Sequence, residues 1–207
     1  MEICEIFHSL QGEGKDLGLP TIFVRTTGCN LRCEWCDTSY AWDGGKDLEI
    51  GIIKEKLDMI SCRRVCITGG EPLLQRDLMG LIEELIPSYE ISIETNGSKD
   101  ISELIKKDLR VSMDYKTPSS GMEEKMIEDN LGLLRERDQL KFVISDMDDY
   151  EFSVEILERS ELDCEVIFQN EEGFELKRLA ESVLTDGVEV RVLPQLHKMI
   201  WTEEKGV

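Results

Sequence analysis

The feature that most limits the fold is an alternation of short β-branched, apolar runs with longer segments of helical periodicity. Strands are predicted at 1–7, 20–25, 64–68, 91–97 with its turn, 111–115, 140–145, 165–169 and 188–193. Helices are predicted where apolar residues recur at helical spacing, over 50–60, 74–85, 122–134, 150–159 and 176–184. Successive strand–helix units indicate a mainly parallel sheet covered by helices, because right-handed crossovers place each helix on a face of the sheet.

Short polar sequences follow many of these strands. They are TTGCN, TGGEP, ETNG, DYKTPSSG and PQLHK. Open parallel sheets and barrels both build their sites at the C-terminal ends of strands, so the pattern does not separate these two architectures. It does predict one active site to which most of the chain contributes.

Three cysteines in the loop after the second strand form a CxxxCxxC pattern: Cys29, Cys33 and Cys36. Thiolates so close together select zinc, copper(I) or an iron–sulfur cluster. Structural zinc sites and electron-transfer clusters normally have four protein ligands, and no fourth one is nearby. The other cysteines are scattered, and His8 and His197 are the only histidines. Three thiolates leave one coordination position open, so a cluster that does chemistry is favoured over zinc.

Length and composition predict one domain over residues 1–207. No apolar run approaches the roughly 20 residues of a membrane helix, and the N-terminus lacks the pattern of a secretory signal, so no membrane association is expected. Seven cysteines, an odd number, argue against a disulfide framework. Free thiols in this spacing predict a cytoplasmic protein, since the cytosol is reducing.

The net charge is −20, from 24 Lys and Arg against 44 Asp and Glu. Nucleic-acid binding depends on clustered cations that displace counterions, so a nucleic-acid partner is not expected. An anionic ligand must therefore be held by a few local cations inside a pocket.

The CxxxCxxC loop resembles that of the radical S-adenosylmethionine (radical SAM) enzymes. In that superfamily three cysteines hold a 4Fe–4S cluster whose fourth iron binds the amino and carboxylate groups of SAM. Gly69-Gly70-Glu71-Pro72 resembles the superfamily's GGEP motif, which holds the amine of SAM. The resemblance implies a partial (β/α)6 barrel of the radical SAM type, modified and trimmed, with parallel strands.

A narrower resemblance covers nearly the whole chain. The sequences QGEG, CNLRCEWCDT, TGGEP, ETNG, KTPSSG and PQLHK, in this order, are similar to those of the 7-carboxy-7-deazaguanine synthase family. Its members are carbon–nitrogen lyases of queuosine and archaeosine biosynthesis. They convert 6-carboxy-5,6,7,8-tetrahydropterin to 7-carboxy-7-deazaguanine by radical ring contraction, with loss of ammonia. A 5′-deoxyadenosyl radical from SAM does the chemistry in that family, so no side chain alone is expected to be the catalyst.

The resemblance also implies a set of site residues. Cys29, Cys33 and Cys36 would hold the cluster, and Thr38 would bind Mg²⁺. The residues expected to bind SAM are Trp35, Cys36, Asp37, Gly69, Gly70, Glu71, Ser112 and Gln169. The residues expected to bind the pterin are Leu10, Gln11, Gly12, Glu13, Arg25, Thr68, Thr95, Lys116 and His197. The expected partners are a flavodoxin- or ferredoxin-type reductant and a second copy of the chain in a homodimer.

Two departures from the family pattern concern the edges of this site. Gln169 is followed by Asn170 where family members commonly have proline, and the C-terminal residues 205–207 lack the proline that members can place in the substrate pocket. Two other functions are weighed against the synthase. A glycyl-radical activating enzyme would share CxxxCxxC but act on a protein, and its motifs explain neither CDT, KTPSSG nor PQLHK. A non-enzymatic zinc or electron-transfer module would need the missing fourth ligand.

Overall fold

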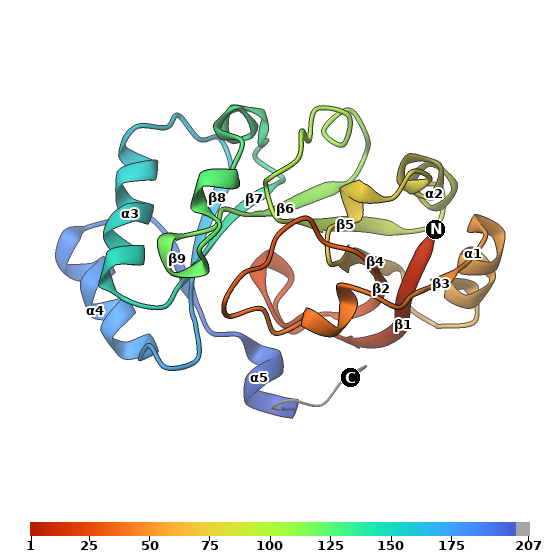
Figure 1. Ribbon diagram of the computed structural model, residues 1–207, viewed down its shortest axis with the longest axis horizontal. Helices are drawn as coiled ribbons and strands as arrows, with labels where there is room; N and C mark the ends of the chain where they lie inside the picture. The colour runs from red at the N-terminus through yellow and green to blue at the C-terminus, as the bar shows by residue number, and fades with distance from the viewer. Residues whose placement is uncertain (202–207) are drawn as a thin grey trace.

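A computed structural model describes residues 1–201, and there the strands form one nine-stranded sheet in the order β3-β1-β2-β4-β5-β6-β7-β8-β9 (Figure 1). The strands are β1 (Glu2–Leu10), β2 (Pro20–Thr26), β3 (Lys46–Asp47), β4 (Arg64–Gly69), β5 (Glu90–Thr95), β6 (Arg110–Asp114), β7 (Gln139–Ile144), β8 (Glu165–Asn170) and β9 (Arg191–Leu193). All pairs from β2 to β9 are parallel, and the sheet does not close. The mainly parallel α/β architecture is therefore confirmed as an open, partial barrel.

The prediction of parallel strands is wrong at one edge, where β1 runs antiparallel to both β2 and β3. The reason is the length of the connection from β1 to β2. Only nine residues, 11–19, join these strands. A parallel pair needs a crossover of a dozen residues or more, whereas an antiparallel pair can be joined by a short loop.

The helices cover the two ends of the sheet. They are α1 (Ile50–Asp58), α2 (Leu78–Leu85), α3 (Met147–Glu158), α4 (Leu176–Asp186) and α5 (Leu196–Trp201). In Figure 1 helices α1 and α2 lie beside the N-terminal strands, and α3 and α4 lie at the opposite end of the sheet. None of these helices in residues 1–201 is long and apolar enough to cross a membrane.

The predicted helix over 122–134 is wrong. The structure has two short 3-10 segments there, Glu123–Lys125 and Glu128–Leu133. Buried Asn130 explains the difference, because its amide donates to Gly97 O at 3.1 Å and to Lys99 O at 2.7 Å. Its Oδ1 also accepts from the backbone N–H of Ile101 at 3.2 Å. These contacts tie the segment to the loop after β5, and such competing side-chain bonds are a known reason why asparagine disfavours helix interiors. The last strand is also shorter than predicted, and α5 was not predicted.

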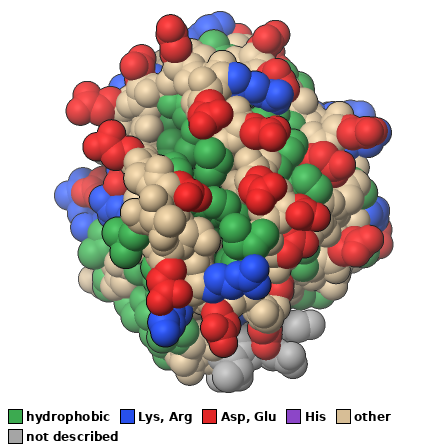
Figure 2. Space-filling view, turned by 90° about the vertical axis from the view of Figure 1, so that its left-hand side faces the viewer, with side chains coloured by type: hydrophobic (Ala, Val, Ile, Leu, Met, Phe, Trp, Pro, Cys, Tyr) green, Lys and Arg blue, Asp and Glu red, His purple; other side chains and the backbone are tan. Residues whose placement is uncertain are grey.

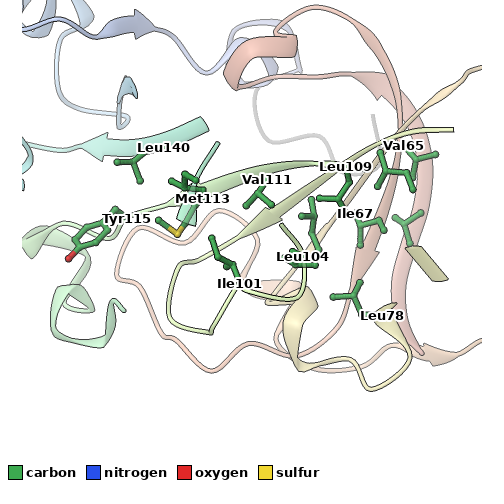
Figure 3. Packing of buried hydrophobic residues seen from close by; sticks show 14 of the residues in the cluster. Val65, Ile67, Leu78, Ile101, Leu104, Leu109, Val111, Met113, Tyr115 and Leu140 are labelled. Carbon is green, nitrogen blue, oxygen red and sulfur yellow. The ribbon is translucent and has the colours of Figure 1, made fainter. Parts of the chain in front are cut away.

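One apolar core lies on the outer side of the sheet, beneath α1 and α2 and the loop after β5. Figure 3 shows Ile67 of β4, Leu78 of α2 and Leu104 of the loop lying together, next to Val111 of β6. All four are at most 2% exposed. The core is continuous along the sheet and includes Met1 at one end and Val183 at the other.

The opposite face of the same strands is polar, because successive side chains on a strand point to opposite faces. The register pairs Arg25 with Thr68 and Ser112 with Glu94 across neighbouring strands, and Asp114 pairs with Lys141. The outside of the protein also carries charge. Acidic side chains are scattered around apolar ones on the face shown in Figure 2, rather than gathered in one patch.

Candidate active site

Two glycines bring the turn after β4 into direct contact with the loop after β2. A Cβ on Gly70 would lie 2.1 Å from the carbonyl oxygen of Gly28 and 3.0 Å from Cβ of Cys29. At Gly69, φ is +148° and a Cβ would lie 2.4 Å from Thr26 O. The backbone N–H of Glu71 then donates to Gly28 O at 2.7 Å. The TGGEP turn needs both glycines, since any side chain there would push the two loops apart.

The predicted cluster ligands lie in what we call the cysteine loop, residues 27–45. Cys29, Cys33 and Cys36 are free and half-buried. The sulfur of Cys29 faces two donors, the backbone N–H of Leu31 at 3.4 Å and the amide of Asn96 at 3.7 Å. Donors of this kind favour a thiolate, which is the form that binds iron.

Electrostatics show that the three thiols influence one another. Burial raises the pKa of the Cys33 thiol, and so do the neighbouring Cys36 and Cys29, while the ammonium of Lys116 lowers it. Burial also raises the pKa of Cys36. Iron binding must displace these protons, as metals do whenever they bind thiols.

Within residues 1–201 no three His, Cys, Asp or Glu side chains converge as they would around a single metal ion. Three thiols that share a short loop, a nearby ammonium and donors to sulfur nevertheless suit a cluster. Each thiolate of a cluster binds a different iron, so its ligands lie further apart than those of one ion. The remaining cysteines do not join them. Cys66 is buried in β4, while Cys62 lies next to Pro20 O at 3.2 Å.

The cysteine loop is fixed to the segment after β6. The indole N–H of Trp35 donates to Ser119 Oγ at 3.3 Å, and Glu34 N donates to Ser120 O at 3.2 Å. The ammonium of Lys116 lies 5.0 Å from the centre of the Trp35 ring. The KTPSSG sequence therefore meets the CEWC sequence, as the expectation of one site requires.

Glu71, a predicted SAM ligand, is completely buried, and its carboxylate is occupied by protein donors. It accepts from the hydroxyl of Thr95 at 3.0 Å, from Asn96 N at 2.8 Å and from Leu73 N at 2.9 Å. Burial raises the pKa of Glu71, although these hydrogen bonds lower it. Its side chain and that of Thr95 thus join the ends of β4 and β5, which leaves the backbone of the turn to face a ligand.

The N- and C-terminal segments meet beside the cysteine loop. A Cβ on Gly12 would lie 2.3 Å from His197 Nδ1, and Leu196 N donates to Gly12 O at 2.9 Å. His197 Nε2 lies 3.8 Å from Asp37 Oδ2, and the hydroxyl of Thr38 donates to Asp37 Oδ1 at 2.7 Å. Although burial raises it, the contacts with His197 and Thr38 hold the pKa of Asp37 below its usual range. The sequences QGEG, CDT and PQLHK therefore lie together at one rim of the candidate site.

Below this rim lies the polar face of the sheet, which we call the sheet floor and define as Arg25, Thr68, Glu94, Asp114 and Lys141. Thr68 Oγ1 donates to Glu94 Oε2 at 2.9 Å, and Gln11 Nε2 donates to Glu94 Oε1 at 3.2 Å. Gln11, Thr68 and Arg25 were predicted from the sequence, whereas Glu94 was not. The available signal was a carboxylate in the strand ISIET, next to Ile93 and two residues from Ser92 on the same face.

A chain of paired charges crosses the sheet floor. Lys141 is only 1% exposed, and its ammonium pairs with Glu13 and, at 3.0 Å, with Asp114. Asp114 also pairs with Lys116 at 3.1 Å, and Glu13 accepts from Gln195 at 2.7 Å. Although burial opposes it, the paired charges raise the pKa of Lys141 and lower those of Glu13 and Asp114. Lys141 and Asp114 were also missed, although a lysine inside the apolar run QLKFVI was a visible signal.

The remaining predicted residues lie at the edges. Ser112 is buried and its hydroxyl accepts from Gln139 at 2.7 Å. Gln169 is fully buried, with its amide 3.4 Å from Pro194 O, and its Oε1 has no partner among residues 1–201. That oxygen is free to accept from a ligand. Leu10 ends β1 and faces Pro20 across the β1–β2 pair. Residues 205–207, to which the missing C-terminal proline belongs, lie outside the described part.

Comparisons with known proteins agree with this arrangement. The family model of the radical SAM superfamily matches residues 23–158. The 7-carboxy-7-deazaguanine synthase of Thermoplasma acidophilum is 42% identical and that of Koribacter versatilis 41%, each over the full length of both chains. The synthase of Aquifex aeolicus is 32% identical over 94% of this chain and 90% of its own.

A solved structure shows the same fold. The crystal structure of QueE from Escherichia coli matches with a TM-score of 0.71 at 24% identity, over 95% of this chain and 94% of that one. The match confirms the architecture of the open, partial barrel. The relatives reported above do not include a glycyl-radical activating enzyme or a zinc or electron-transfer module.

Proposed function

Because the chain belongs to the radical SAM superfamily and within it to the 7-carboxy-7-deazaguanine synthases, we propose that it converts 6-carboxy-5,6,7,8-tetrahydropterin to 7-carboxy-7-deazaguanine with loss of ammonia. The protein is thus a radical SAM lyase of deazapurine biosynthesis. One observation carries the proposal most strongly. The glycine turn after β4 rests on the loop that holds three free thiols, so a cluster and the SAM bound to it would share one small space.

The cluster would be held by Cys29, Cys33 and Cys36, and the backbone of Gly69 and Gly70 would face SAM. Bound together, cluster and SAM supply the 5′-deoxyadenosyl radical that removes hydrogen from the pterin. The protein's part is to orient the substrate and to exclude water from this chemistry. Trp35 would cover one side of the space for the cluster and SAM, and its ring is held by contacts with Ser119 and Lys116.

The sheet floor would bind the pterin. Gln11 and Thr68 already donate to Glu94, so that carboxylate is oriented before any ligand arrives. Glu13 is held ionised by Lys141 and can accept from N–H groups of the pterin. His197 and Gly12 would close the rim above.

A magnesium ion at Thr38 is a further part of the proposal. The Thr38 hydroxyl and the Asp37 carboxylate lie together at the rim, 2.7 Å apart. Mg²⁺ prefers oxygen ligands and usually binds with few protein groups plus substrate oxygens and water. The substrate carboxylate would supply the missing oxygen, and the ion would orient it.

The setting of the reaction is also proposed. No disulfide joins the cysteines of residues 1–201, which suits a reducing cytoplasm. An electron must reach the cluster, so a flavodoxin- or ferredoxin-type protein is the expected reductant. A homodimer is expected from the family resemblance alone.

The proposal is tested by anaerobic reconstitution with iron and sulfide, followed by SAM, Mg²⁺, dithionite and the tetrahydropterin. We expect formation of 7-carboxy-7-deazaguanine, detected by mass spectrometry, with release of ammonia. The matched control is the same protein without SAM, which should give no product. SAM cleavage without any consumption of the pterin would show that the chain acts on another substrate.

A further inference from the structure

Arg25 is held in a clamp formed by three side chains from neighbouring segments. Its Nε donates to Glu5 Oε1 at 2.8 Å, and the hydroxyl of Tyr40 donates to the same oxygen at 2.8 Å. The guanidinium carbon lies 5.6 Å from the ring centre of Phe7 and 5.9 Å from that of Tyr40. Two aromatic rings and one carboxylate thus fix both the position and the plane of the guanidinium.

The clamp follows from the antiparallel edge of the sheet. Glu5 and Arg25 are direct partners across β1 and β2, and so are Phe7 and Phe23, whose rings stack at 5.0 Å. Tyr40 comes from the cysteine loop, in the short 3-10 segment Ser39–Ala41. The clamp therefore joins the sheet floor to the loop that carries Thr38.

Most of the hydrogen-bonding capacity of Arg25 remains unused. A guanidinium has five N–H donors, and only the one on Nε has a partner among residues 1–201. The side chain is 16% exposed, so its terminal nitrogens are largely withdrawn from bulk water. A buried charged donor without an acceptor is costly, and a carboxylate that binds both terminal nitrogens would remove that cost.

We propose that Glu5 and Tyr40 are positioning residues that orient Arg25 so that its two terminal nitrogens bind the carboxylate of the substrate. This inference rests on the proposed function, and it explains how the site distinguishes a carboxylated pterin from one without the group. Thr38 and Tyr40 lie in one loop. The Mg²⁺ ion proposed at Thr38 and the guanidinium that Tyr40 helps to position would therefore bind the same carboxylate. Burial also raises the pKa of Tyr40, which keeps its hydroxyl a donor.

The test measures binding rather than turnover. Wild type, Glu5→Gln and Tyr40→Phe are reconstituted anaerobically and titrated with 6-carboxypterin and with unsubstituted pterin by calorimetry, without reductant. We expect each substitution to weaken the binding of 6-carboxypterin roughly three- to tenfold, the range for losing one ordinary hydrogen bond, because the substitutions act on Arg25 and not on the ligand itself. Binding of unsubstituted pterin should change less than about twofold, because it has no carboxylate for the clamp to serve.

Matched controls separate this role from a structural one. Glu90 lies near Arg64 Nε at 3.6 Å and Tyr89 donates to Asp58 at 2.7 Å, both away from the site. Glu90→Gln and Tyr89→Phe should leave both affinities at the wild-type values. If Glu5→Gln and Tyr40→Phe weaken the binding of both pterins equally, or of neither, the clamp does not orient Arg25 toward the carboxylate and the inference is wrong. If wild type binds neither pterin, the proposed function fails as well.

Discussion

The cysteine loop and the sheet floor differ in how completely the protein itself satisfies their polar groups. In the loop the three thiols are half-buried and touch few partners, and the hydroxyl of Thr38 donates to its neighbour Asp37. In the floor Lys141 is fully buried between two carboxylates, and both oxygens of Glu94 accept hydrogen bonds. Apart from the terminal nitrogens of Arg25, the polar groups of the floor are thus satisfied without a ligand, whereas those of the loop are not.

This difference predicts different consequences of mutation. A substitution in the floor removes a partner from a buried group, so it should lower the free energy of unfolding as well as substrate binding. A substitution at a loop ligand removes a group that the fold does not use, so it should abolish chemistry and leave stability nearly unchanged.

The largest expected effect is at the cluster ligands. Cys33→Ala should lower SAM cleavage at least about 1,000-fold, because two thiolates cannot retain four irons. The iron-free protein should melt within about 2 °C of wild type, as for other exposed or half-exposed sites. Cys164→Ala, outside the site, is the matched control and should keep both cluster and activity. Full activity in Cys33→Ala would show that the cluster is bound elsewhere.

The second effect is on stability. Lys141→Met leaves two half-buried carboxylates, Glu13 and Asp114, without their shared cation, so we expect unfolding to become easier by about 3 kcal/mol. Urea denaturation of the iron-free protein measures this. Lys177→Met is the control, since Lys177 lies on the surface of α4 beside Glu181, and such pairs contribute at most about 0.5 kcal/mol. Similar losses in the two variants would mean that the floor is not a more tightly coupled region than the surface.

The third effect concerns Mg²⁺. Thr38→Ala should lower turnover roughly 10- to 100-fold, because a substrate misplaced by about 1 Å loses that much rate. Its dependence on Mg²⁺ should disappear, while the cluster still forms and SAM still binds. Thr38→Ser keeps the hydroxyl and should remain Mg²⁺-stimulated. Initial rates measured against Mg²⁺ concentration in wild type and both variants test this prediction. A wild-type Mg²⁺ response in Thr38→Ala would locate the ion elsewhere.

The smallest effect is the pH dependence of the floor. Although burial raises both values, Lys141 holds the pKa of Glu13 below its usual value of 4.5, and Lys116 together with Lys141 holds that of Asp114 below 3.8. Their contribution to stability is therefore present above those values and is lost as the pH falls through the lowered ones. The stability difference between wild type and Lys141→Met should shrink by about 1 kcal/mol between pH 7 and pH 4, as Glu13, whose ion pair is lost, gains a proton in the variant. A difference that is constant over this range would contradict the assigned pairing.

The cysteine loop was more predictable from sequence than the floor, and the reason is physical. Ligands within one loop have a spacing that can be read directly, and the glycines beside Glu71 mark a close approach of two backbones. The floor residues come from different strands, and they meet only through the register of the sheet. Lys141 and Glu94 therefore looked like single charges in their strands until their neighbours were known.

The errors in the fold have similar causes. Periodicity identified most strands and helices, because it reports which face of an element is buried. It predicted a helix over 122–134 because apolar residues recur there, but Asn130 makes its hydrogen bonds to the loop after β5 instead. Strand direction is not part of the pattern either, so the antiparallel β1 could not be recognised from periodicity.

The central claim is that the cysteine loop holds a cluster with one iron left open for SAM, above a floor that is already formed. Electron paramagnetic resonance of the anaerobically reconstituted and reduced protein tests it most directly, recorded with and without SAM. We predict a 4Fe–4S signal in wild type that changes when SAM is added, and no such signal in Cys33→Ala. A cluster signal that SAM does not alter, or that persists unchanged in Cys33→Ala, would contradict the claim.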